Sequence, residues 1–128
     1  MNRIVLDASA ILAVINSEPG AEKLTPALLE RAVVSTVNLT EVQTKLLSRG
    51  WTSDAAWEDA TSPVREIVAF DEEQSRIAAD LATQTRHLGL SLGDRACLAL
   101  GTVLDVPVYT AEKLWKKCKV DVKVHLIR

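Results

Sequence analysis

The chain has 128 residues, the length of one domain, and 48% of them are hydrophobic whereas only 4% are aromatic. Its core must be built mostly from Leu, Val, Ile and Ala, which favours helices packed on aliphatic strands. The net charge of −2 excludes a uniformly basic nucleic-acid binder, and no apolar run approaches the ~20 residues that span a bilayer. The two cysteines make no disulfide framework and fit a reducing cytoplasm.

Short apolar runs alternate with helical patterns along the chain. The run RIVL at 3–6 predicts a strand, and the spacing of Ile11, Leu12 and Ile15 predicts a helix over 8–15. Leucines at helical spacing predict a helix over 21–31, provided that Pro26 lies in its first turn. The other expected elements are, in order, strand 32–34, helix 37–49, helix 54–61, strand 66–70, helix 72–87, a buried helix opened by Asp94, strand 106–109, helix 110–117 and strand 122–127.

This order predicts an α/β protein with a short, mostly parallel five-stranded sheet. Strands that alternate with helices form parallel sheets, because each helix returns the chain to the same end of the sheet. The strands are nearly all aliphatic, as a sheet covered by helices on both faces requires. We see no linker or repeat and therefore expect residues 1–128 to form a single domain.

Four acidic residues stand where a ligand site of such a sheet is expected. Asp7 directly follows the first strand, and Glu41 lies just over a turn into the helix after the second. Asp94 opens the buried helix, and Glu112 follows the fourth strand by two residues. Open α/β sheets bind ligands beyond the carboxyl ends of their strands. Carboxylates gathered there repel one another unless a cation balances them, and Mg²⁺ and Mn²⁺ prefer oxygen ligands.

A simpler explanation applies to three of the four acids. Acidic residues are common in the first turns of helices, where they cap free N–H groups and complement the helix dipole. Asp7, Asp94 and Glu112 could each be only such a cap. Glu41 lies too far into its helix to cap it, so its position favours a site.

The segments VLDASAIL, NLTEV, GLSLGDRACLAL and VYTAEKLW resemble, in this order, the four acidic motifs of the PIN-domain ribonucleases. The closest match is to the VapC-type toxins of toxin–antitoxin pairs, and it covers essentially the whole chain. Each motif alone is weak, but the ordered set of four is specific. The resemblance implies a three-layer α/β/α fold and an endoribonuclease that depends on one or two Mg²⁺ or Mn²⁺ ions.

The resemblance also assigns roles to residues. The carboxylates would hold ions that bind the scissile phosphate and activate a water. Glutamate is one methylene longer than the aspartate usual at the fourth position, so the last acid would reach the metal differently or through water. The catalytic and metal-binding acids would be Asp7, Glu41, Asp94 and Glu112.

Contacts with RNA are expected from three further residues near these acids and from a basic segment. Ser9 belongs to the first motif and Thr110 to the fourth, while Arg95, next to Asp94, is expected to contact a phosphate. A solvated basic face is the alternative explanation for the segment. The basic segment lies at the end of the chain and contains Lys113, Lys116, Lys117, Lys119, Lys123 and Arg128.

Protein partners are also implied. Members of the resembled family usually form homodimers and are inhibited by a small antitoxin, whose tail lies along the active-site groove. The apolar segments 11–15 and 24–29 are expected to wall this groove. Ile11 and Ile15 are expected to be partly buried within the chain or across a dimer. Trp51 and Trp57 are expected in the core, with an interface as the alternative.

Two other functions remain open. A PIN fold that has lost catalysis and serves as a scaffold is one, because of the departure at Glu112. The other is a receiver-like signalling domain, which needs a phosphoacceptor Asp after the third strand and a Lys after the fifth. Asp71 follows the third predicted strand, but no Lys follows the fifth.

Overall fold

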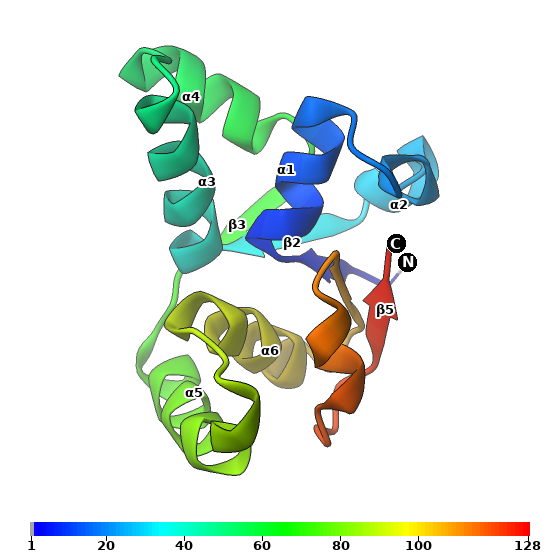
Figure 1. Cartoon of the computed structure of the whole chain (residues 1–128), viewed down its shortest axis with the longest axis vertical. Coiled ribbons are helices and arrows are strands. Elements are labelled where there is room, and N and C mark those ends of the chain that lie inside the picture. Colours follow the sequence, from blue (N-terminus) through cyan, green and yellow to red (C-terminus); the bar gives the residue numbers. More distant parts are fainter. Residues whose placement is uncertain (1) are drawn as a thin grey trace.

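A computed structural model describes residues 2–128 as a parallel sheet between two layers of helices (Figure 1). The sheet has the strand order β3-β2-β1-β4-β5, and every neighbouring pair is parallel. This confirms the three-layer α/β/α fold. The strands are β1 (Ile4–Leu6), β2 (Ala32–Ser35), β3 (Glu66–Val68), β4 (Val108–Thr110) and β5 (Val124–Leu126).

The sheet is buried on both faces because successive side chains of each strand point to opposite sides. Ile4, Leu6 and Val34 belong to the core cluster on one face, whereas Val5 and Val33 belong to the cluster on the other. All five side chains are at most 2% exposed. The runs at 4–6 and 32–34 are therefore continuously aliphatic, because the side chains on both sides of these strands are buried.

Helices on one face of the sheet are α1 (Ala8–Asn16), α2 (Pro26–Leu29), α3 (Thr36–Ser48) and α4 (Ser53–Thr61), and those on the other are α5 (Glu72–Gln84) and α6 (Leu92–Leu104). Three short 3₁₀ helices are η1 (Ala21–Lys23), η2 (Arg86–Leu88) and η3 (Lys113–Lys117). Each α-helix begins at a side chain that accepts a backbone N–H. Among residues 2–128, no helix is long and apolar enough to cross a membrane.

Several elements differ in extent from those predicted. The helix expected over 21–31 is split into η1 and α2, because Thr25 caps a new helix with Pro26 at its first position. The helix expected over 110–117 is only η3, and the third strand ends at Val68. Helix α6 begins at Leu92 rather than at Asp94, because Ser91 is its cap.

The expected core position of the two tryptophans is wrong. Trp51 is 39% exposed and Trp57 47% exposed, and Trp51 Nε1 donates a hydrogen bond to Asp59 Oδ2 at 2.7 Å. Helices α3 and α4 fill their interface with smaller side chains such as Ala56 and Ala60. Ile11, by contrast, is fully buried within the chain.

The strand order creates a crevice beside β1. From β1 the chain builds β2 and β3 on one side, and it then returns to place β4 on the other side of β1. Such a switch in direction separates the loops that follow β1 and β4, and ligands of open α/β sheets bind there. The residues after β1 and β4 therefore face one another across the expected binding position.

Candidate active site

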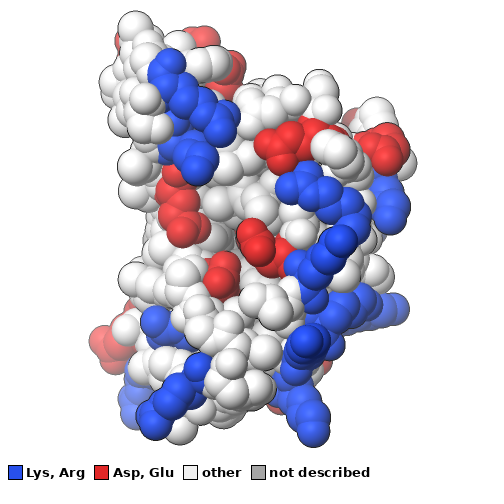
Figure 2. Space-filling view, in the orientation of Figure 1, with Lys and Arg blue, Asp and Glu red and all other residues white. Residues whose placement is uncertain are grey.

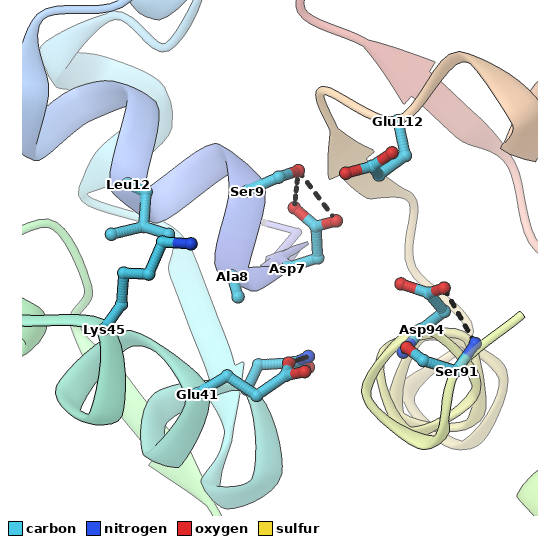
Figure 3. A pocket seen from close by; sticks show the side chains of 10 residues that line it. Asp7, Ala8, Ser9, Leu12, Glu41, Lys45, Ser91, Asp94 and Glu112 are labelled. Atoms are coloured by element: carbon cyan, nitrogen blue, oxygen red, sulfur yellow. Dashed lines mark hydrogen bonds between the residues drawn. The ribbon is translucent and has the colours of Figure 1, made fainter. Parts of the chain in front are cut away.

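The four acids predicted from the sequence lie around one cavity of about 400 Å³ at the carboxyl ends of the strands. Asp7 comes from the junction of β1 and α1, and Glu41 from the second turn of α3. Asp94 comes from the first turn of α6, and Glu112 from the segment after β4. Figure 3 shows their carboxylates pointing into the same space. The fold thus brings together residues that lie up to 105 positions apart in the sequence.

Asp7 forms the floor of the cavity and is only 3% exposed. Its carboxylate accepts hydrogen bonds from the Ala10 backbone N–H at 2.8 Å and from Thr110 Oγ1 at 2.6 Å. Burial raises the pKa of Asp7 from 3.8 to about 6, against the opposing effect of its hydrogen bonds, and the charge of Asp94 raises it slightly further. The protein therefore keeps a carboxylate where its negative charge is unfavourable.

Ser9 and Thr110 fix the position of Asp7. Ser9 Oγ lies 2.8 and 2.9 Å from the two carboxylate oxygens and accepts the backbone N–H of Ala111 at 2.9 Å. Thr110 Oγ1 accepts the backbone N–H of Glu112, also at 2.9 Å. These bonds join the start of α1 to the segment after β4. Ser9 and Thr110 thus hold two acids, Asp7 and Glu112, in relation to each other.

Asp94 is a helix cap and a cavity residue at once. Its Oδ2 accepts the backbone N–H of Ser91 at 3.0 Å, and its own N–H donates to Ser91 Oγ at 3.2 Å. This pair is a capping box at the start of α6. The two explanations offered by the sequence do not exclude each other, because one carboxylate oxygen serves the cap and the side chain still lines the cavity.

Arg95 lies away from the cavity. Its Nη1 donates to the Ala78 carbonyl of α5 at 2.9 Å, and Arg95 is not among the lining residues. Consecutive residues of a helix point about 100° apart, so the neighbour of Asp94 faces α5 instead. This placement does not fit the expected phosphate contact. Arg95 instead links α6 to α5 through its hydrogen bond to Ala78.

Sequence analysis missed three polar residues of the cavity. Asn38 and Lys45 lie on α3 at one turn before and one turn after Glu41, and Ser91 lies next to Asp94. The spacing 38, 41, 45 is the signal that could have found two of them, because residues three and four apart share a helix face. In Figure 3 Lys45 extends from α3 toward Leu12 on α1.

The chemistry of the lining residues fits a divalent cation. All four acids offer hard oxygen ligands, and the buried charge of Asp7 is one that a cation would stabilise. Within residues 2–128, however, no three His, Cys, Asp or Glu side chains are close enough to one another to form a closed metal site. The acids are gathered around the cavity rather than drawn onto one point.

Basic residues surround the acidic cavity. Figure 2 shows acidic side chains in the hollow at the centre of this face and Lys and Arg side chains along its edge. Many of the basic atoms lie over the segment that follows β4, which is orange and red in Figure 1. A polyanion lying across this face would meet positive charge outside the cavity and negative charge within it.

Solved structures show the same fold. A chain of the DNA-bound VapBC complex from Salmonella typhimurium matches with a TM-score of 0.76 and 12% identity over 100% of both chains. VapBC2 from Rickettsia felis, bound to a promoter DNA fragment, gives 0.74 and 16% over 96% of this chain and 97% of that one. VapC20 from Mycobacterium tuberculosis, a sarcin-ricin loop cleaving toxin, gives 0.69 and 18% over 93% and 98%.

Sequence comparison identifies the family directly. No curated protein matches the chain. The family description "PIN domain" matches residues 4–118, a range that begins at β1 and ends just after η3. This range contains all four acids of the cavity and all four segments whose resemblance was noted in the sequence. The chain therefore belongs to the PIN domain family.

Proposed function

We propose that this chain, acting as one PIN domain over residues 1–128, is a Mg²⁺- or Mn²⁺-dependent endoribonuclease and the VapC-type toxin of a cytoplasmic toxin–antitoxin pair. The observation that carries the proposal is the convergence of four carboxylates around one cavity, with the buried Asp7 held by Ser9 and Thr110. The shared fold with a toxin described as cleaving the sarcin-ricin loop supports RNA as the substrate.

The cavity residues would have different roles in phosphodiester hydrolysis. A bound divalent ion would supply a Lewis acid that binds a phosphate oxygen and lowers the pKa of a water. Asp7, Asp94 and Glu41 would hold this ion, and Glu112 would complete the set directly or through water. Ser9 and Thr110 prevent Asp7 from turning away, because both hydroxyls bond to its carboxylate.

Lys45 replaces Arg95 as the expected phosphate contact. It lines the cavity on the side of α1 and is exposed. A phosphate held near the four acids would meet an ammonium group there, whereas the Arg95 guanidinium is already bonded to α5.

Lys45→Ala is expected to weaken RNA binding and to flatten its salt dependence. Losing one phosphate contact removes about 0.7 from the slope of log K against log salt for a single strand. Arg95→Ala is the matched control, since it also removes one positive charge but should lower the melting temperature instead. Filter binding from about 50 to 200 mM salt and thermal melts measure both. A change of slope for Arg95→Ala alone would reverse the assignment.

A homodimer and an antitoxin are the proposed protein partners. The expected groove wall requires a correction, because Ile11 is fully buried and cannot contact a second protein. Ile15, Leu28 and Leu29 are only partly buried and remain available on the same side. Light scattering after size-exclusion chromatography determines whether the isolated chain dimerises.

The test of the proposed function is cleavage of a long folded RNA by the purified protein. We expect cleavage with Mg²⁺ or Mn²⁺ and none with EDTA, because the attacking water depends on the metal. Expression of the wild type without an antitoxin should arrest growth. RNA left intact by protein that binds Mn²⁺ would favour the scaffold without catalysis.

A further inference from the structure

Asn38 joins the two helices that carry Glu41 and Asp94. It lies in the first turn of α3 and is only 1% exposed. Its Nδ2 donates to Glu41 Oε1 at 2.9 Å and to the carbonyl of Gly93 on α6 at 3.0 Å. The Asn38 amide nitrogen thus connects the Glu41 carboxylate to Gly93, the residue immediately before Asp94.

Among neutral side chains, only an amide NH₂ group can make this connection. Both partners are acceptors, so the bridging atom must supply two N–H donors. A flipped amide would place Oδ1 against the Glu41 carboxylate and the Gly93 carbonyl, where all three oxygens repel. Within residues 2–128 the buried Oδ1 of Asn38 has no hydrogen-bond partner. Since an unpaired buried carbonyl is unfavourable, stability alone does not explain an asparagine here.

Gly93 makes room for the carboxylate that Asn38 holds. A Cβ built on Gly93 would overlap both carboxylate oxygens and the Cδ of Glu41. Gly93 lies in the first turn of α6, where alanine would favour the helix more. Its carbonyl bonds to Asn38, and its Cα lies against the group that Asn38 positions. Helix propensity therefore does not explain Gly93, and the unpaired Oδ1 is unfavourable at Asn38.

We propose that Asn38 is a positioning residue for the Glu41 carboxylate and that Gly93, by lacking a side chain, leaves the space that this carboxylate occupies. Asn38 pulls the carboxylate toward α6, and Gly93 lets it lie against the helix beside Asp94. Without them Glu41, which is exposed on the second turn of α3, would be free to rotate into solvent. The inference rests on the proposed function, because it gives this acid a fixed place in a metal-binding set.

Two variants separate positioning from folding. Gly93→Ala should melt at or above the wild-type temperature, because alanine favours a helix, yet it displaces Glu41. Asn38→Leu keeps the number and branching of the side-chain heavy atoms and removes both donors. We expect each to weaken Mn²⁺ binding about 10- to 100-fold, the usual effect of losing a partner that orients a metal ligand. Free Mn²⁺ measured by electron paramagnetic resonance gives the affinity.

Val42→Ala is the matched control on α3. Its side chain is fully buried on the core side, so the variant should melt lower than the wild type and bind Mn²⁺ with unchanged affinity. Equal Mn²⁺ affinity of the wild type, Gly93→Ala and Asn38→Leu would overturn the positioning role. So would a loss of affinity that follows melting temperature across all three variants.

A metal-free measurement keeps this inference distinct from the proposed function. In the NMR spectrum of the wild type in EDTA, the Asn38 side-chain NH₂ should be protected from exchange with water. One of its protons should shift strongly in Glu41→Ala. An unshifted, rapidly exchanging NH₂ would refute the bridge even if the protein cleaves RNA. A protected and shifted NH₂ in a protein that cleaves RNA with neither Mg²⁺ nor Mn²⁺ would support the bridge and refute the nuclease.

Discussion

Asp7→Ala, Glu41→Ala and Asp94→Ala should each lower RNA cleavage by more than about 100-fold. Removing a partner that only orients a metal ligand already costs 10- to 100-fold, and these changes remove the expected ligands themselves. Each acid reaches the cavity from a different element, so no neighbour can take its place. Initial rates with Mn²⁺ on one RNA, measured by gel electrophoresis, give the effects directly.

Glu112 provides a graded comparison within the same experiment. Its side chain is exposed at the rim, and it is longer than the usual aspartate. Glu112→Ala should therefore reduce cleavage less than the other three changes, and Glu112→Asp should be tolerated. Equal cleavage by the wild type and Asp94→Ala would reveal a contaminating nuclease, and the proposed function would then have to be withdrawn.

Asp94 requires a second control because it also caps α6. Alanine at this position loses the acceptor for the Ser91 N–H, which should destabilise the protein by about 1 kcal/mol. Asparagine keeps an acceptor oxygen and loses the charge. Asp94→Asn should therefore melt near the wild-type temperature and still fail to cleave RNA. Comparing Asp94→Ala with Asp94→Asn separates the capping role of Asp94 from its role in the cavity.

Asp7→Asn should stabilise the metal-free protein at neutral pH. Burial raises the pKa of Asp7 to about 6, so at pH 7 the folded protein contains an unfavourable buried charge. A shift of about two pKa units corresponds to roughly 3 kcal/mol as an upper value, and asparagine can still accept the Ala10 N–H. We expect a rise of about 1–3 kcal/mol in the free energy of unfolding, measured by urea titration in EDTA.

The gain from Asp7→Asn should depend on pH in a defined direction. Between about pH 4 and 6 Asp7 binds more protons in the folded wild type than in the unfolded chain, so the contribution of Asp7 to stability falls as the pH rises through this window. Below pH 4 Asp7 is protonated in both states, and the difference between variant and wild type should become small. A gain that is equal at pH 4 and pH 7 would contradict burial of the charge as its cause.

Added Mn²⁺ should make the wild type more stable than Asp7→Asn, which reverses the order expected in EDTA. A ligand that binds only the folded state stabilises it in proportion to the logarithm of its concentration. The wild type should therefore gain stability as Mn²⁺ is added, whereas Asp7→Asn should gain little. If Mn²⁺ raised both melting temperatures equally, the ion would be bound elsewhere.

The local features of this protein were determined by the sequence alone. Short apolar runs predicted all five strands, most clearly β1 and β2, which are buried on both faces, and the residues after the strands placed Asp7 and Glu112 at strand ends. Helical spacing and caps predicted α1, α3, α4 and α5 to within a few residues. These features depend on neighbours within one helical turn or one strand, and such neighbours can be read directly from a sequence.

The tertiary structure decided which of these features meet. Strand order depends on long-range pairing, and only the return of the chain past β1 brings Thr110 within 2.6 Å of Asp7. The same holds for Arg95, whose direction follows from the position of α5, and for Trp51, which smaller side chains exclude from the core. Asn38 and Gly93 lie 55 positions apart, and their connection exists only because α3 and α6 pack together at the edge of the sheet. Side-chain direction relative to a distant element is a property of packing, and packing is not a local property of the sequence.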